Sequence, residues 1–86
     1  MEFDELVLQT FLDKQLQLFP EVVAETLEDA EYFLEDMFAV VCKNKKEVRR
    51  YFDEAGADIS GMSEKELLAS SEVFPLPDGR YLIVEG

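Results

Sequence analysis

The chain has 86 residues and a net charge of −12 at pH 7, from 20 acidic and 8 basic side chains. A charge of this sign repels nucleic acid and anionic membranes and favours basic partners, and a chain of this length forms one domain. Nearly half of the residues are apolar and glycine and proline are few, which argues against disorder. We therefore predict a single soluble domain over residues 1–86.

The negative charge is concentrated in the first half of the chain. Residues 1–38 contain eleven acids and one base, Lys14, whereas residues 39–86 contain nine acids and seven bases. No basic leader follows Met1, and no apolar run approaches the roughly 18 to 20 residues that a membrane span needs. The lone cysteine, Cys42, lies in an apolar run, as expected for a buried thiol in a reducing compartment. We expect a cytoplasmic protein.

Two helices are predicted in the acidic half. Apolar residues spaced three and four apart predict a first helix from about residue 3 to residue 19, ending near Pro20. Its apolar face would contain Phe3, Val7, Leu8, Phe11, Leu12, Leu16 and Phe19. Thr26 with Asp29 resembles a capping box and begins a second helix, which runs to about Asp36. Its buried side would contain Leu27, Ala30, Phe33 and Leu34.

A strand and two further helices follow. The run MFAVVC at residues 37–42 is β-branched, aromatic and apolar on both faces, which predicts a strand covered on both sides. Asn44 then caps a third helix that ends at Gly56, where we expect the left-handed conformation. Ser63 with Glu66 forms a capping box for a short helix over residues 64–71.

The C-terminal segment predicts a β-hairpin. The sequence LPDGR suits a type I turn with Pro77 at its second position and Gly79 at positive φ. This turn sets Phe74 opposite Leu82 and Pro75 opposite Tyr81. The two prolines remove N–H donors from the side facing away from residues 80–84, so strand 72–76 should be a blunted edge and strand 80–84 the middle strand.

The predicted fold is therefore α+β, in the order ααβααββ, with a small three-stranded sheet packed by helices. Alternation would place Val73, Tyr81 and Ile83 on one face of the hairpin and Phe74, Leu76, Leu82 and Val84 on the other. Both faces are apolar. The four helices could cover both, but a domain this small has little helical surface left after packing one face, and an uncovered apolar face would tend to associate. We therefore expect a homodimer formed face to face or through the first helix.

The residue types limit the chemistry. There is no histidine, which excludes Ser-His and Cys-His nucleophilic pairs and removes the commonest zinc ligand. No glycine-rich phosphate loop is present. Glu28, Glu31 and Glu35 form a carboxylate row that could hold a hard cation weakly, but a solvated acidic face is the favoured interpretation. We predict no catalytic residue, no cofactor and no metal.

Five basic residues form a cluster in this otherwise acidic chain. Its members are Lys43, Lys45, Lys46, Arg49 and Arg50. Helix N-terminal amides with lysines could bind an anion or a partner. The favoured alternative is that these bases neutralise the second helix, with Arg49 to Asp53 and Arg50 to Glu54 as pairs within the third helix.

The segment from FAVVCKNKKEVRRYFDEAGADIS to LPDGRYLIVEG resembles one βαβββ half of the glyoxalase, or vicinal-oxygen-chelate, superfamily. That family builds a metal site from His, Gln and Glu in paired modules, and the resemblance implies that only Glu85 of this chain corresponds to a ligand. The whole chain also resembles a group of small acidic bacterial proteins without an assigned activity.

Two functions remain open from the sequence. The first is a non-enzymatic interaction or regulatory module with a protein partner, which the charge suggests is basic. The second is a small-molecule-binding module of glyoxalase-like ancestry without a complete metal site. A cleft lined by convergent polar groups would favour the second, and an exposed apolar patch would favour the first.

Overall fold

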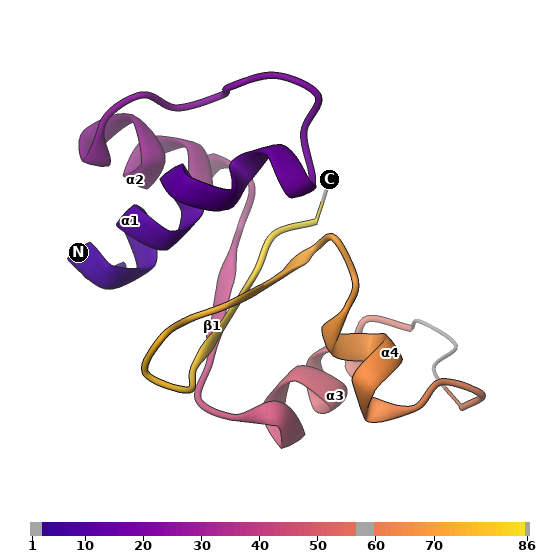
Figure 1. Ribbon diagram of the computed structural model, residues 1–86. Helices are drawn as coiled ribbons and strands as arrows, with labels where there is room; N and C mark the ends of the chain where they lie inside the picture. The colour runs from indigo at the N-terminus through magenta and orange to yellow at the C-terminus, as the bar shows by residue number, and fades with distance from the viewer. Residues whose placement is uncertain (1–2, 57–59, 86) are drawn as a thin grey trace.

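A three-stranded antiparallel sheet lies between two pairs of helices in the computed structural model, which describes residues 3–56 and 60–85 (Figure 1). The helices are α1 (Glu5–Lys14), α2 (Leu27–Asp36), α3 (Lys45–Glu54) and α4 (Glu64–Leu68). The strands are β1 (Val40–Cys42), β2 (Val73–Pro75) and β3 (Tyr81–Ile83). The predicted α+β class and the order ααβααββ are confirmed, with one 3-10 turn, η1 (Gln15–Gln17), added after α1.

Strand β3 is the middle strand, as predicted. The sheet order is β1-β3-β2, and Phe74 pairs with Leu82 and Pro75 with Tyr81. The hairpin closes with a hydrogen bond of 2.8 Å from the Leu76 N–H to the Arg80 carbonyl oxygen, and Gly79 has φ +94°. The positive φ explains why glycine stands at this position of the turn.

The sheet divides the interior into two apolar cores. Phe74, Leu76, Leu82 and Val84 face α1 and α2, where Phe11, Leu8 and Leu34 complete the first core. Val73 and Ile83 face the other way and pack with Val48, Phe52 and Leu67 from α3 and α4. The predicted division of the hairpin side chains between the two faces is confirmed.

The expectation that one sheet face is left uncovered is wrong. Helices α1 and α2 lie on one side of the strands and α3 and α4 on the other (Figure 1). Even the short α4 contributes the buried Leu67 to the second core. The exposed apolar sheet face from which a face-to-face dimer was expected is therefore absent from the described residues.

Each helix begins where the sequence places a capping side chain. Asp4, Thr26, Asn44 and Ser63 accept hydrogen bonds of 3.0–3.2 Å from the backbone N–H three residues later. Gly56 has φ +84° just after α3, as predicted. These local signals explain why helix starts were predicted better than helix ends.

The first helix is shorter than predicted. Helix α1 ends at Lys14, where φ is −121°, and the chain tightens into η1 instead of continuing to Pro20. As a result Leu16, assigned to the buried helical face, is 61% exposed. The fourth helix is also shorter, because it ends at Leu68 and not at residue 71.

The predicted strand 37–42 is reduced to Val40–Cys42. The Ala39 N–H donates to the Leu34 carbonyl oxygen and the Phe38 N–H to that of Glu35, so residues 37–39 form the C-terminal turn of α2. This turn requires a left-handed residue, and Phe38 supplies it with φ +55°. The predicted strand, covered on both sides, would bury Phe38, but the side chain of this residue is 85% exposed.

Gln15 is a buried polar side chain that holds the connection between α1 and α2. Its Oε1 accepts hydrogen bonds from the N–H groups of Val23 and Ala24, at 2.7 and 3.0 Å. Its Nε2 donates to the carbonyl oxygens of Leu12 and Ala24, at 3.1 and 2.9 Å. The amide thus satisfies backbone groups of a segment that has no regular secondary structure.

Replacing Gln15 with alanine should lower the free energy of unfolding by about 2–4 kcal/mol, because it leaves several part-buried or buried backbone groups without partners. Urea unfolding followed by circular dichroism measures the change. The matched control is Gln9→Ala, because Gln9 is exposed and bonds only to the Asp13 carboxylate at 3.0 Å. Equal effects of the two changes would contradict the role assigned to Gln15.

Candidate functional site

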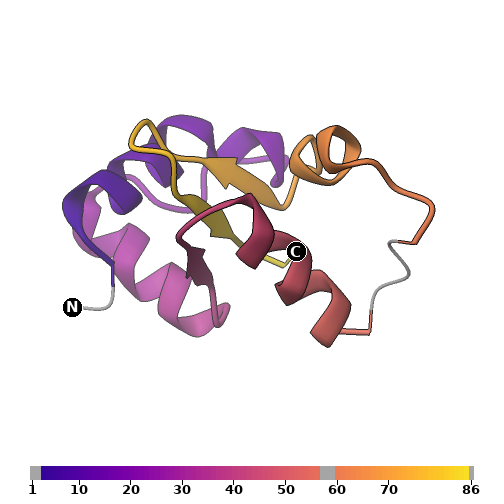
Figure 2. The ribbon, with the colours of Figure 1, turned by 90° about the horizontal axis from the view of Figure 1, so that it is seen from below.

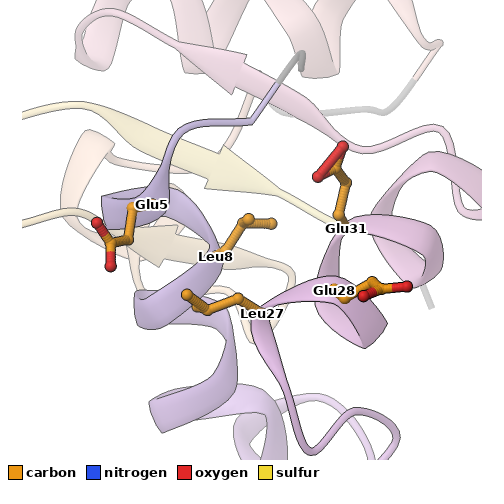
Figure 3. A pocket seen from close by; sticks show the side chains of 5 residues that line it. All are labelled: Glu5, Leu8, Leu27, Glu28 and Glu31. Atoms are coloured by element: carbon orange, nitrogen blue, oxygen red, sulfur yellow. The ribbon is translucent and has the colours of Figure 1, made fainter.

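A groove lies between α1 and α2 on the acidic half of the described chain. It has a volume of about 380 Å³ and is lined by Leu8, Leu27, Glu5, Glu28 and Glu31. Figure 3 shows the two leucines between the helices, with Glu5 on the α1 side and Glu28 and Glu31 on the α2 side. The groove is therefore an apolar floor with a carboxylate rim.

The packing of α2 on α1 determines which side chains line the groove. Helix α2 buries Ala30 and Leu34 against α1, which leaves Leu27 at the margin of the contact and turns Glu28 outward. The N-terminal turn of α2 contains only acidic charges. No basic side chain lines the groove among the residues described, so its electrostatic field is that of three carboxylates. The arrangement suits a cationic group attached to an apolar stem.

The basic cluster predicted from the sequence lies on α3 and on the residue pair preceding it. Lys43, Lys45, Lys46, Arg49 and Arg50 are all exposed. Within the described residues their one ion pair is Lys45 Nζ to Glu64 Oε1 on α4, at 3.5 Å. An exposed pair of this kind adds about 0–1 kcal/mol to stability.

The favoured explanation of this cluster is not what the structure shows. The bases do not pair with α2, because the sheet separates α3 from α1 and α2. The expected pairs to Asp53 and Glu54 are also absent from the described ion pairs. The Glu47 carboxylate accepts the Lys43 N–H at 2.8 Å beside the start of α3, which places a negative charge where an anion would bind.

Tyr51 and Glu85 connect α3 to the chain after β3. The Tyr51 hydroxyl donates to Glu85 Oε1 at 3.0 Å. Burial and this hydrogen bond to the carboxylate raise the pKa of Tyr51 to about 12. Glu85, the residue that the glyoxalase resemblance relates to a metal ligand, thus serves as a hydrogen-bond acceptor. The order after β1 is also helix, helix, strand, strand, not the helix and three strands of a βαβββ module.

The raised pKa of Tyr51 predicts a pH-dependent stabilisation. The folded-state pKa of about 12 lies above the ordinary value of 10.0, so the stabilisation is complete below pH 10 and is lost between pH 10 and about 12. Tyr51→Phe should lower the free energy of unfolding by about 0.5–1 kcal/mol near pH 8, and the difference should shrink by about pH 11.

Urea unfolding at the two pH values tests this prediction. Tyr32→Phe is the control, because the Tyr32 side chain is 61% exposed and its loss should change stability by less than about 0.5 kcal/mol. A difference between wild type and Tyr51→Phe that stays constant with pH would contradict the raised pKa of the Tyr51 hydroxyl.

Cys42 is buried at the end of β1, facing the second core. Burial, and to a smaller degree the negative charge of Glu47, raise the pKa of its thiol. Both effects disfavour the thiolate, which is the nucleophilic form. The position is that of a structural apolar residue.

We expect the Cys42 thiol to react with a soluble disulfide reagent about a hundredfold more slowly in the native protein than in the urea-unfolded chain, because burial limits access and disfavours the thiolate. Absorbance of the released thiolate measures both rates at one pH. Similar rates would contradict the burial of this side chain.

Two further structural findings bear on the class of site. In the part of the chain covering residues 3–56 and 60–85, no group of three or more His, Cys, Asp or Glu side chains is arranged to hold a metal ion. No helix in the same residues has the length and apolar character needed to cross a bilayer. Glu28 and Glu31, two members of the predicted carboxylate row, line the groove, and Glu35 is not among its lining residues.

The sequence did not predict the groove, nor the exposed, left-handed position of Phe38. The carboxylates of α2 were recognised as an acidic row, but their position beside Leu8 depends on how α1 packs on α2. A signal for Phe38 was present, since the residue follows the acidic end of a predicted helix at the place where a left-handed residue is needed.

Comparisons with protein-family models, with curated proteins and with solved structures give no match to this chain.

Proposed function

We propose that the protein is a non-enzymatic, cytoplasmic interaction or regulatory module that binds a basic segment of a partner protein in the groove between α1 and α2. The observation that carries the proposal is the combination of an apolar floor, Leu8 and Leu27, with a rim of three glutamates. The Glu5 and Glu28 carboxylates point away from each other (Figure 3), so the rim does not converge on one small molecule. It agrees with the net charge of −12, which attracts basic partners over distances of about a Debye length.

The groove suits lysine and arginine side chains in particular. Their methylene stems can lie on leucine while the charged head reaches a carboxylate at the rim. Each such exposed pair contributes only about 0–1 kcal/mol, so useful affinity needs several contacts along one segment. Three rim glutamates on two helices can contact more than one cation of the same segment.

A different protein suits this site better than a second copy of the chain. Both apolar sheet faces are covered by helices, and two copies of the acidic half would repel each other. The proposed partner therefore supplies positive charge, which residues 1–38 carry only at Lys14.

Binding of a fluorescent lysine- and leucine-containing peptide, measured by anisotropy, tests the proposal. Glu28→Gln with Glu31→Gln should weaken binding about three- to tenfold, because two rim carboxylates lose their charge. A glutamate- and leucine-containing peptide of equal length should not bind.

The control double variant is Glu21→Gln with Glu25→Gln. It removes the same charge from the same half of the chain, and its exposed residues do not line the groove. If both double variants weaken binding equally, the overall field attracts the peptide and the groove is not the site.

A further inference from the structure

The two edges of the sheet differ in their capacity to pair with another strand. At the β2 edge, the Val73 N–H donates to the Ser70 carbonyl oxygen at 3.0 Å, and the Val73 carbonyl oxygen accepts from Gln17 Nε2 at 2.9 Å. Pro75 has no N–H to offer. Pro75 and the Gln17 side chain together close this edge. The prediction holds for Pro75 but not for Pro77, which lies in the turn after β2.

The β1 edge is open at its centre. Arg80 and Val84 make backbone hydrogen bonds toward Leu76 and Glu72, so alternation turns Tyr81 and Ile83 toward β1. Their partners are Cys42 and Val40, which leaves the N–H and C=O of Val41 directed away from the sheet. Figure 2 shows β1 at the margin of the sheet, between the end of α2 and the start of α3.

The N–H groups on either side of Val41 are already used. The Ala39 N–H donates to the Leu34 carbonyl oxygen at 3.0 Å, and the Lys43 N–H donates to Glu47 Oε1 at 2.8 Å. An added antiparallel strand can therefore exchange two hydrogen bonds with Val41 and donate one each to the carbonyl oxygens of Ala39 and Lys43. Additional affinity must come from side chains.

An exposed aromatic side chain lies at the start of this edge. Phe38 is 85% exposed and its φ of +55° is unfavourable for an aromatic residue. A large apolar side chain held in solvent by a strained backbone is unusual unless it contacts a partner.

The charges on the two faces of the sheet are opposite beside this edge. Helix α2, on the face toward which Val41 points, has Glu28, Asp29, Glu31, Glu35 and Asp36 and no base. The first half of helix α3, on the other face, has Lys45, Lys46, Arg49 and Arg50 with one acid, Glu47, and Asp53 and Glu54 lie at its far end. Because side chains of a strand alternate between faces, every second side chain of a strand added here lies on the acidic α2 side and the others lie on the α3 side, where bases outnumber acids.

We propose that the β1 edge binds an extended segment of a partner protein as a fourth strand, with basic side chains toward α2 and acidic side chains toward α3. The inference rests on the proposed interaction function but assigns a second surface to it. The charge pattern selects the register of the partner strand, and Phe38 supplies apolar contact at one end.

Two peptides of identical composition test the proposal. In Thr-Lys-Glu-Val-Glu-Lys-Thr, setting valine opposite Val41 places both lysines on the α2 side and both glutamates on the α3 side. In Thr-Glu-Lys-Val-Lys-Glu-Thr the charges are exchanged. Both sequences are palindromic in charge, so the comparison holds for parallel and antiparallel pairing.

The readout is the amide spectrum of the isotope-labelled protein during peptide titration. We expect the first peptide to shift the Val41 amide signal and to slow its hydrogen exchange, and the second to bind about tenfold more weakly or less. N-methylation of the valine in the first peptide should abolish the effect, because it removes one donor to Val41.

Two variants separate edge pairing from general attraction. Val41→Pro removes an N–H that points away from the sheet and should abolish binding, whereas Val41→Ala keeps the N–H and should retain it. Phe38→Gly should weaken binding without lowering the melting temperature, because glycine accepts positive φ at no steric cost. The melting temperature shows that each variant is folded.

The outcomes distinguish the two proposals. Equal binding of the two peptides, shifts confined to β2, or no shift at millimolar peptide would overturn the strand-addition site. Shifts of Leu8, Leu27 and Glu28 alone would overturn it while supporting the groove. If the lysine- and leucine-containing peptide does not bind the groove, but the first strand peptide still shifts the Val41 amide signal, the groove proposal is overturned and the strand site is supported.

Discussion

The middle strand β3 is apolar on both faces, and this constraint shapes the rest of the structure. Leu82 points into one core and Ile83 into the other, and neither can face water without losing about 1.5–3 kcal/mol of burial free energy. A sheet with two apolar faces needs a layer on each side, so the chain divides its four helices between them. The short α4 belongs to the second of these layers, where Leu67 packs in the same core as Ile83.

The division into layers also separates the charges. The acidic helices α1 and α2 lie on one side of the sheet and the basic start of α3 on the other. The acidic α2 and the basic start of α3 are close along the chain but lie on opposite sides of the sheet. This explains why Lys45 pairs with Glu64 of α4 and not with α2. The consequence is an acidic groove on one side of the sheet and a basic start of α3 on the other.

Two glutamines perform structural roles that hydrophobic patterns do not reveal. Gln15 satisfies backbone groups of the connection between α1 and α2, and Gln17 donates to the carbonyl oxygens of Ser71 and Val73 at the β2 edge. Both lie in η1, so ending α1 early is what directs them to these partners. The helical periodicity continued through this segment, but the hydrogen bonds of two amides outweigh it, and Leu16 becomes exposed.

The sequence by itself determined the fold class, the element order, the hairpin register and the division of hairpin side chains between two faces, because caps, turns and alternation act over a few residues. It also identified Lys43, Lys45, Lys46, Arg49 and Arg50 as a distinct cluster. Only the tertiary structure decided what these residues lie beside. The end of α1, the turn at Phe38, the coverage of both sheet faces and the groove at Leu8 and Leu27 depend on contacts between segments far apart in the chain. Periodicity predicts which side of an element is buried, but it does not specify the element that buries it.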